Sequence, residues 1–471
     1  ASACQLACTR DSSCEGYTVT EGPVPDAGIV AWGDSSYGGS GAPEDGTYVS
    51  IFSTNRAFAA LNASGHITAW GSSSRGGSGA PTDNGYVTIS STFGAFAALK
   101  DDGSIASWGH SSYAGSGAPT DIAYVKIFST DYAFAALNAS GHITAWGNTN
   151  YGGSGAPTDN GYVNVFSTMG AFAALKDDGS ITAWGSSDNG GSGAPTNNGY
   201  TTIFSNDYAF AALNASGHIT AWGSSNYGGS GAPTDNGYVT ISSTATAFAA
   251  MKADGSIAVW GDSSEGGSGA PSGKYVNVFS NKETFAALNA SGHIAVWGSS
   301  SHGGSGAPTT GAYVTIVSTG LAFAALKNDG SIFAWGNSFD GGCNSGETPL
   351  TGATCAPSGT YVNIFSTMKA FAAIKADGSM AVWGYSSSGG SGAPSSGTYA
   401  TIFSTDEAFA AIPQANTYAY GPANANATGT GYAIARISGT SQRKVVRRKV
   451  LTGDSNLVTI SDGDFRQANL D

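Results

Sequence analysis

The chain has 471 residues, of which only 11% are charged and 70 are glycine, and its net charge is −13. A body this acidic repels phosphate backbones, which argues against nucleic acid as a partner. No run of about 18 apolar residues occurs, so we expect no membrane span. The charge is uneven: the segment from Arg436 onward carries 7 basic and 4 acidic residues, and the remainder carries 12 and 28.

Residues 1–26 form a first segment with three of the five cysteines, Cys4, Cys8 and Cys14. The odd number leaves one thiol as a candidate for an intermolecular bond. The spacing of these cysteines together with "DSSCEGY" resembles a fragment of a PAN/apple module, an extracellular interaction domain; a disulfide-tied N-terminal cap is the alternative. The chain begins with Ala and has no signal-peptide pattern, which fits a mature product or a trimmed chain.

Residues 27–421 repeat one unit, whose ten Trp residues all stand in Trp-Gly and mostly recur every 38 residues. Three apolar runs recur in each unit, for example Tyr86–Ser90, Ala95–Leu99 and Ile67–Trp70. They are rich in β-branched and aromatic residues and bounded by Gly, Asp, Asn and Pro, which is typical of strands. "KDDGS" or "NASGH" joins the second run to the third and predicts a glycine hairpin. We therefore expect an all-β tandem array of ten three- to four-stranded antiparallel units that bury their aromatic residues between neighbours.

The stretch "FAALKDDGSITAWG" followed by a Gly-rich loop resembles the repeat of the regulator-of-chromosome-condensation family. The resemblance covers Ala27 to about Gly421 and implies a β-propeller. The unit is shorter than that family's blade, and ten units exceed its usual number, so an open β-superhelix is the alternative. The family's nuclear exchange activity is not expected here, since nothing matches its partner-binding insertions.

The two ends of the array decide between these forms. The first unit begins at a third strand, Ile29–Trp32, whereas Ala400–Ser404 and Ala408–Ile412 supply the two strand types that it lacks. Pairing these segments would close a ring. Thr417–Gly421 also has the pattern of a degenerate third strand, and if it completes the last unit, both ends stay open. Open complementary ends permit head-to-tail assembly into a filament.

Asn-x-Ser/Thr recurs at one hairpin position in every second unit, and it predicts N-glycosylation of an exposed turn in a secreted protein. Duplication of a two-unit block explains the spacing without function. Because "KDDG" is expected to turn the chain equally well, the turn itself does not call for Asn. The predicted acceptors, including one beyond the hairpins, are Asn62, Asn138, Asn214, Asn289 and Asn426.

Cys343 and Cys355 bracket the insertion "CNSGETPLTGATC" in a longer unit. A disulfide that closes this loop is the economical interpretation and implies an oxidising compartment. Metal ligation is the competing idea, but no His or Cys pair nearby supports it.

Residues 422–471 contain three β-type runs, Tyr432–Ile437, Val445–Leu451 and Leu457–Ile460. The middle run holds a cluster of cations that either guards an edge strand or docks on the acidic body of a neighbouring copy. A processing site for dibasic proteases is a third interpretation. These predicted assembly residues are Arg443, Lys444, Arg447, Arg448 and Lys449.

Catalysis needs different residues that converge at one place, whereas here the same polar residues recur in each unit. The hairpin histidines are 76, 76 and 75 residues apart, and the "DDG" carboxylates are turn formers. We expect no enzyme, no catalytic or metal-binding residue and no cofactor. The histidines in question are His66, His142, His218 and His293.

The leading hypothesis is a secreted, glycosylated structural protein that assembles with copies of itself into an extracellular fibre or surface layer. It rests on the array, the unmatched ends, the odd cysteine and the basic tail on an acidic body. The alternative is a closed β-propeller that acts as a lectin-like or protein-interaction module. Covalent N-linked glycans and further copies of the chain are the expected partners.

Overall fold

The computed structural model describes residues 28–121, 123–344, 347–348, 351–414, 430–436 and 443–449. Gly28–Pro413 is one compact unit. Outside it, β32 (Thr430–Arg436) and β33 (Arg443–Lys449) pair antiparallel over seven residues each. Their residue ranges overlap two of the three runs expected in residues 422–471. The third run, Leu457–Ile460, lies outside the described residues.

The compact unit consists of ten antiparallel sheets, each built from a first, a second and a third strand, as the sequence predicts. The first strands are β2 (Tyr48–Ser53), β5 (Tyr86–Ser91), β8 (Tyr124–Ser129), β11 (Tyr162–Ser167), β14 (Tyr200–Ser205), β17 (Tyr238–Ser243), β20 (Asn277–Ser280), β23 (Tyr313–Ser318), β27 (Tyr361–Ser366) and β30 (Tyr399–Ser404). The second strands are β3 (Ala57–Asn62), β6 (Ala95–Lys100), β9 (Ala133–Asn138), β12 (Ala171–Lys176), β15 (Ala209–Asn214), β18 (Ala247–Lys252), β21 (Thr284–Leu288), β24 (Ala322–Lys327), β28 (Ala370–Lys375) and β31 (Ala408–Pro413). The third strands are β1 (Val30–Gly33), β4 (Ile67–Gly71), β7 (Ile105–Gly109), β10 (Ile143–Gly147), β13 (Ile181–Gly185), β16 (Ile219–Gly223), β19 (Ile257–Gly261), β22 (Ile294–Gly298), β25 (Ile332–Gly336) and β29 (Met380–Tyr385).

A short 3-10 turn follows each third strand, which the sequence analysis did not foresee. These turns are η1 (Ser35–Tyr37), η2 (Ser73–Arg75), η3 (Ser111–Tyr113), η4 (Thr149–Tyr151), η5 (Ser187–Asn189), η6 (Ser225–Tyr227), η7 (Ser263–Glu265), η8 (Ser300–His302), η9 (Ser338–Asp340) and η10 (Ser386–Ser388). The residue after the turn has positive φ, for example 93° at Gly38, where a Cβ atom would lie 2.7 Å from the ring of Phe58. Glycine therefore serves both the backbone and the close approach of the ring.

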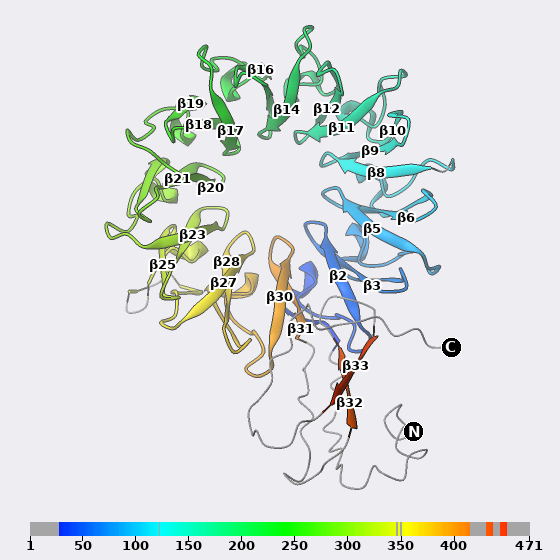
Figure 1. Ribbon diagram of the computed structural model, residues 1–471, viewed down its shortest axis with the longest axis vertical. Helices are drawn as coiled ribbons and strands as arrows, with labels where there is room; N and C mark the ends of the chain where they lie inside the picture. The colour runs from blue at the N-terminus through cyan, green and yellow to red at the C-terminus, as the bar shows by residue number, and fades with distance from the viewer. Residues whose placement is uncertain are drawn as a thin grey trace. The chain divides into compact units, whose positions relative to one another are not determined.

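The strands run radially, and the first strand of each unit points toward the centre of the ring (Figure 1). Because successive strands are antiparallel, the turn between the first and second strands lies at the inner rim. The hairpin between the second and third strands lies at the outer edge for the same reason. Among the described residues, a fourth strand occurs only in the unit with the insertion, where β26 (Ala353–Thr354) pairs with β29.

The ring closes through the first strand of the chain. β1 pairs with β31, with Trp32 opposite Phe409, and so completes the sheet that β30 begins. First strands of neighbouring units lie side by side around all ten units, including β30 beside β2. The propeller-like form is thus the one that the structure adopts. Of the two alternatives left open by the sequence, the one in which β1 fills the last sheet is observed. Thr417–Gly421 lies outside the described residues.

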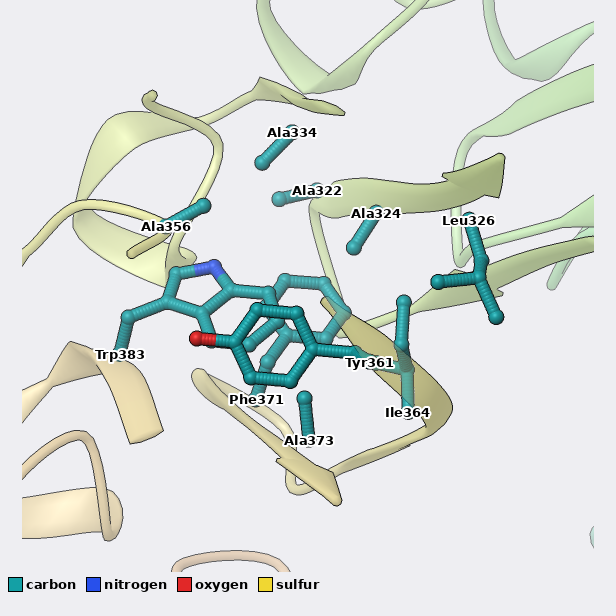
Figure 2. Close-up of a cluster of buried hydrophobic side chains, with 10 residues drawn as sticks. All are labelled: Ala322, Ala324, Leu326, Ala334, Ala356, Tyr361, Ile364, Phe371, Ala373 and Trp383. Carbon is teal, nitrogen blue, oxygen red and sulfur yellow. The ribbon is translucent and has the colours of Figure 1, made fainter. Parts of the chain in front are cut away.

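Aromatic rings of one unit pack against alanines of the preceding unit. In Figure 2, Phe371 and Trp383 lie against Ala322 and Ala324, and all four are fully buried. The Phe and Trp of each unit face each other across the second and third strands and stack, at a centroid distance of 5.0 Å for this pair. Alanine leaves room for the large rings to interdigitate, so the core lies between units, as predicted.

Candidate binding surface

The inner-rim turns begin with two residues that the fold requires. Thr54 Oγ1 accepts a hydrogen bond from the amide of Ala57 and donates one to the carbonyl of Arg75, both at 3.0 Å. The preceding serine links units, since Ser91 Oγ donates to the carbonyl of Ser53 at 2.7 Å. Two units have Asn in place of Thr, and these Asn side chains make equivalent bonds to the turn and to the 3-10 segment.

The third turn residue closes a ring of backbone hydrogen bonds. The amide of each such residue donates to the carbonyl of its counterpart in the next unit, from Asn55 to Phe93 and onward through ten bonds. The last bond joins Asp406 to Asn55 at 3.1 Å. Only backbone atoms take part, so the side chain at this position is free to vary.

Three rim positions vary from unit to unit, whereas the strands around them are nearly constant. The third turn residues are Asn55, Phe93, Asp131, Met169, Asp207, Ala245, Lys282, Gly320, Met368 and Asp406. The fourth turn residues are Arg56, Gly94, Tyr132, Gly170, Tyr208, Thr246, Glu283, Leu321, Lys369 and Glu407. The last residues of the 3-10 turns are Tyr37, Arg75, Tyr113, Tyr151, Asn189, Tyr227, Glu265, His302, Asp340 and Ser388. We call these three sets together the inner rim.

The third turn residues and the Ser-Thr pairs line a central cavity of about 820 Å³. Burial, with the negative charges of Asp207 and Asp406, raises the pKa of Asp131 to about 6. Burial raises the pKa of Asp207 and of Asp406 as well. Phe93 and Lys282 also line the cavity, so its lining is apolar in one unit and cationic in another. In the described part of the chain, no group of three His, Cys, Asp or Glu residues is placed to hold a metal ion.

The part of the inner rim from Glu265 to Glu407 is charged and internally paired. His302 Nδ1 lies 2.5 Å from Glu283 Oε2, and Lys369 Nζ lies 2.8 Å from Glu407 Oε1. Glu265 accepts a hydrogen bond from the hydroxyl of Thr246. These carboxylates are therefore largely satisfied by neighbours within the ring.

The predicted glycosylation sites lie at outer hairpins, and there Asn has a structural role. Asn62 Oδ1 accepts hydrogen bonds from the amide and hydroxyl of Ser64, at 3.0 and 2.8 Å, and from the amide of His66 at 2.9 Å. Asp102 accepts equivalent bonds from Ser104 in the "KDDG" hairpin. Both hairpins make the same backbone turn, and Lys100 stands at the position of Asn62, so the turn itself does not call for Asn. The same geometry recurs at Asn138, Asn214 and Asn289, whereas Asn426 lies outside the described residues.

The remaining predicted residues are distributed as follows. Cys343 and Cys355 form the expected disulfide. Cys4, Cys8 and Cys14 lie outside the described residues. The predicted assembly residues Arg443, Lys444, Arg447, Arg448 and Lys449 all belong to β33, for which only the backbone is described. The four hairpin histidines stand in alternate units, each beside its own Asn.

The described helical segments are all short, and none has the length and apolar character needed to span a membrane.

No family model and no curated protein matches the sequence. Similar solved structures include the ectodomain of the receptor kinase CR4 from Physcomitrella patens, at 19% identity over 55% of this chain and 77% of that one, with a TM-score of 0.35. Prp20p from Saccharomyces cerevisiae has 15% identity over 51% and 82%, with a TM-score of 0.32. Yeast RCC1 (Prp20) bound to Kap60 has 12% identity over 86% and 96%, with a TM-score of 0.37. The structural neighbours thus include RCC1 and other β-propellers, and a likeness at these identities concerns the fold alone.

Proposed function

We propose that this protein is a non-enzymatic binding scaffold, a short-unit, ten-membered relative of the regulator-of-chromosome-condensation propellers that engages a partner through its inner rim. The observation that carries the proposal is the concentration of unit-to-unit differences at the inner rim. The fold needs the Ser-Thr pair and the backbone ring there, and it leaves the variable side chains free. Repeat proteins present binding surfaces in this way, on a constant frame.

Secretion and N-glycosylation belong to the same proposal. The disulfide between Cys343 and Cys355 favours an oxidising compartment. Ala63 and Ser64, beside the acceptor Asn62, are exposed at an outer hairpin, away from the inner rim. Glycans there would leave the ring opening clear. Intact mass of native material before and after peptide-N-glycosidase treatment tests this part, and an unchanged mass contradicts it.

Binding is tested on an array of immobilised polysaccharides and extracellular proteins. The matched variant is Tyr132→Gly with Tyr208→Gly, because the chain itself has Gly94 and Gly170 at this position in other units. We expect saturable binding that the double variant weakens while the thermal midpoint stays close to that of the parent. Absence of any saturable binding, or binding that the rim substitutions leave unchanged, overturns the proposal.

Self-assembly into a fibre or layer is the second candidate. Because the ring is closed, unmatched ends no longer support self-assembly. An exposed valine that recurs from unit to unit does favour it. Eight of the first strands carry or directly follow a valine that is 45–61% exposed, and most of these valines are the extra residue of a β-bulge. Thr201 and Ala400 occupy this position in the other two units. Association surfaces are typically contiguous apolar patches, and the second candidate requires that these valines, one per unit on neighbouring first strands, act together as one.

Sedimentation and negative-stain imaging of concentrated native protein test the second candidate. A variant with Val49→Thr, Val87→Thr and Val125→Thr copies a residue that the chain already tolerates at Thr201. We expect assemblies that this variant disperses. A monomer at all concentrations excludes self-assembly and leaves the binding proposal standing.

A further inference from the structure

One part of the inner rim combines aromatic side chains with cationic ones that form no salt bridge to a described residue. It comprises Tyr37, Arg56, Arg75, Tyr113, Tyr132 and Tyr151, which we call the aromatic arc. The rings of Tyr113 and Tyr132 stack at 5.2 Å, and those of Tyr132 and Tyr151 at 4.4 Å. The stack therefore continues from Tyr113 through Tyr132 to Tyr151, and Tyr37 with Arg56 belongs to the same inner rim.

The two arginines of the arc lack ionic partners. The guanidinium of Arg56 lies 4.5 Å from the ring centre of Tyr37, and that of Arg75 lies 4.6 Å from that of Tyr113. Neither makes a salt bridge to any described residue, whereas Lys369 on the charged part of the rim is paired with Glu407. Arg56 Nε and Arg75 Nη1 are buried and have no hydrogen-bond acceptor within the described chain. The positive charge of Arg56 partly offsets the raised pKa of Asp406 without forming a salt bridge with it, and guanidinium donors that stay unsatisfied favour an anionic partner.

The tyrosines of the arc offer hydroxyls rather than ring faces. Both faces of Tyr132 are covered by its stacked neighbours, so an incoming ligand meets ring edges. Within the described residues, no hydrogen bond engages the hydroxyl of Tyr113, Tyr132 or Tyr151. The tyrosines that begin the first strands differ, since most of their hydroxyls are bonded, as Tyr162 is to Asp159 and Thr182.

A ligand that fits has a few separate anionic groups on a chain rich in neutral hydroxyls. A dense polyanion such as polyphosphate or fully ionised polygalacturonate does not fit, because the net charge is −13 and the rest of the rim is acidic, so the suitable probe is a polygalacturonate in which most carboxylates are methyl esters. An apolar ligand does not fit, because the ring faces are already covered. A carboxylated polysaccharide offers carboxylates for the two arginines and hydroxyls for the tyrosine edges.

We propose that the aromatic arc is the binding site for a uronate-bearing polysaccharide. This inference rests on the proposed binding function and names its ligand class. Carboxylates pair with Arg56 and Arg75, and sugar hydroxyls bond to the phenols of the arc.

The test is calorimetric titration of the full chain with largely methyl-esterified polygalacturonate, whose free carboxylates are sparse, and with neutral galactan and poly-glutamate. The variants are Arg56→Thr and Arg75→Ser, whose new residues the chain carries at the same positions as Thr246 and Ser388. Each is expected to weaken polygalacturonate binding by about 10-fold or more, as loss of a charged hydrogen bond does. Arg56→Lys, which copies Lys369, should restore part of the affinity.

Lys126→Thr is the matched control, since it removes an exposed cation outside the inner rim and copies Thr88 at the same position of another unit, and it should leave affinity unchanged. Equal binding of poly-glutamate overturns the sugar assignment. Equal loss in the Lys126 control, or no loss in the arginine variants, overturns the site. If the inner rim binds only other polysaccharides or proteins of the test array, the ligand class is refuted and the proposed binding scaffold stands.

Discussion

The closing strand β1 provides a sharp test of the ring. Trp32 is 3% exposed, stacks on Phe409 at 5.2 Å and donates a hydrogen bond to the carbonyl of Gly389 at 3.1 Å. Trp184 has nearly the same surroundings, at 4% exposure, 5.1 Å from Phe172 and 3.0 Å from the carbonyl of Gly152. The difference is that a hairpin joins Trp184 to its partner strand, whereas β1 is remote in sequence from β31.

Trp32→Ala and Trp184→Ala each leave a large cavity, so each is expected to lower the free energy of unfolding by about 3–5 kcal/mol. Urea denaturation followed by circular dichroism measures this loss. Only Trp32→Ala should also open the ring, because β1 has four paired residues and no covalent hairpin to hold it. Hydrogen exchange should then rise in β31 of Trp32→Ala more than in β12 of Trp184→Ala.

Two results would refute this reasoning. A Trp32→Ala variant within about 0.5 kcal/mol of the parent would mean that β1 does not fill the last sheet, because surface substitutions have effects of that size. If hydrogen exchange rises equally in β31 of Trp32→Ala and in β12 of Trp184→Ala, the pairing of β1 with β31 is no weaker than that of two strands joined by a hairpin.

Three further predictions concern single sites. Asn62→Asp should keep the hairpin bonds and remove the sequon, so intact mass falls by one glycan without loss of stability, whereas Asn62→Ala should also cost about 1 kcal/mol in urea denaturation. Asp131 has a pKa raised to about 6 against a usual value of 3.8. The folded state therefore binds the proton more readily than the unfolded state. The resulting contribution to the free energy of unfolding is full below about pH 4 and is lost as pH rises through 6. Asp131→Asn should thus stabilise the protein at pH 7.5 and have no such effect at pH 4; the opposite order contradicts the burial of this carboxyl. Replacing Cys343 and Cys355 by Ser should lower the free energy of unfolding by about 2–3 kcal/mol, and reducing agent should then have no further effect on the thermal midpoint.

Local structure was well predicted because its signals are local. Ala95–Leu99 was expected as a strand and is observed within Ala95–Lys100. The disulfide between Cys343 and Cys355 also followed from spacing within one loop. The hydrogen bonds of Asn62 were not predicted although Ser64 stands two residues away, and the "KDDG" hairpin takes its acceptor, Asp102, from a different position of the turn.

The closure of the ring was undecided from sequence. Ile29–Trp32 and Thr417–Gly421 both carry the pattern of a third strand, and a pattern does not say which partner β31 takes. The inner rim was missed as a site, although unit-to-unit differences after each Ser-Thr pair are visible in the repeat. The repeat pattern does not show that all these turns meet around one opening, because that depends on how the units are arranged in space.

The sequence by itself determined the repeating unit, since alternating apolar residues, glycine turns and Trp-Gly positions act over a few residues. It also determined that the aromatic residues are buried between units, because a single three-stranded sheet cannot bury both faces. Tertiary structure alone decided that ten units complete one turn and that β1 closes it. The angle between neighbouring units depends on how the Phe and Trp of one unit pack on the alanines of the preceding unit. The ten angles must add up to a full circle for the ring to close. That sum brings Arg56, Arg75 and the stacked tyrosines into one surface.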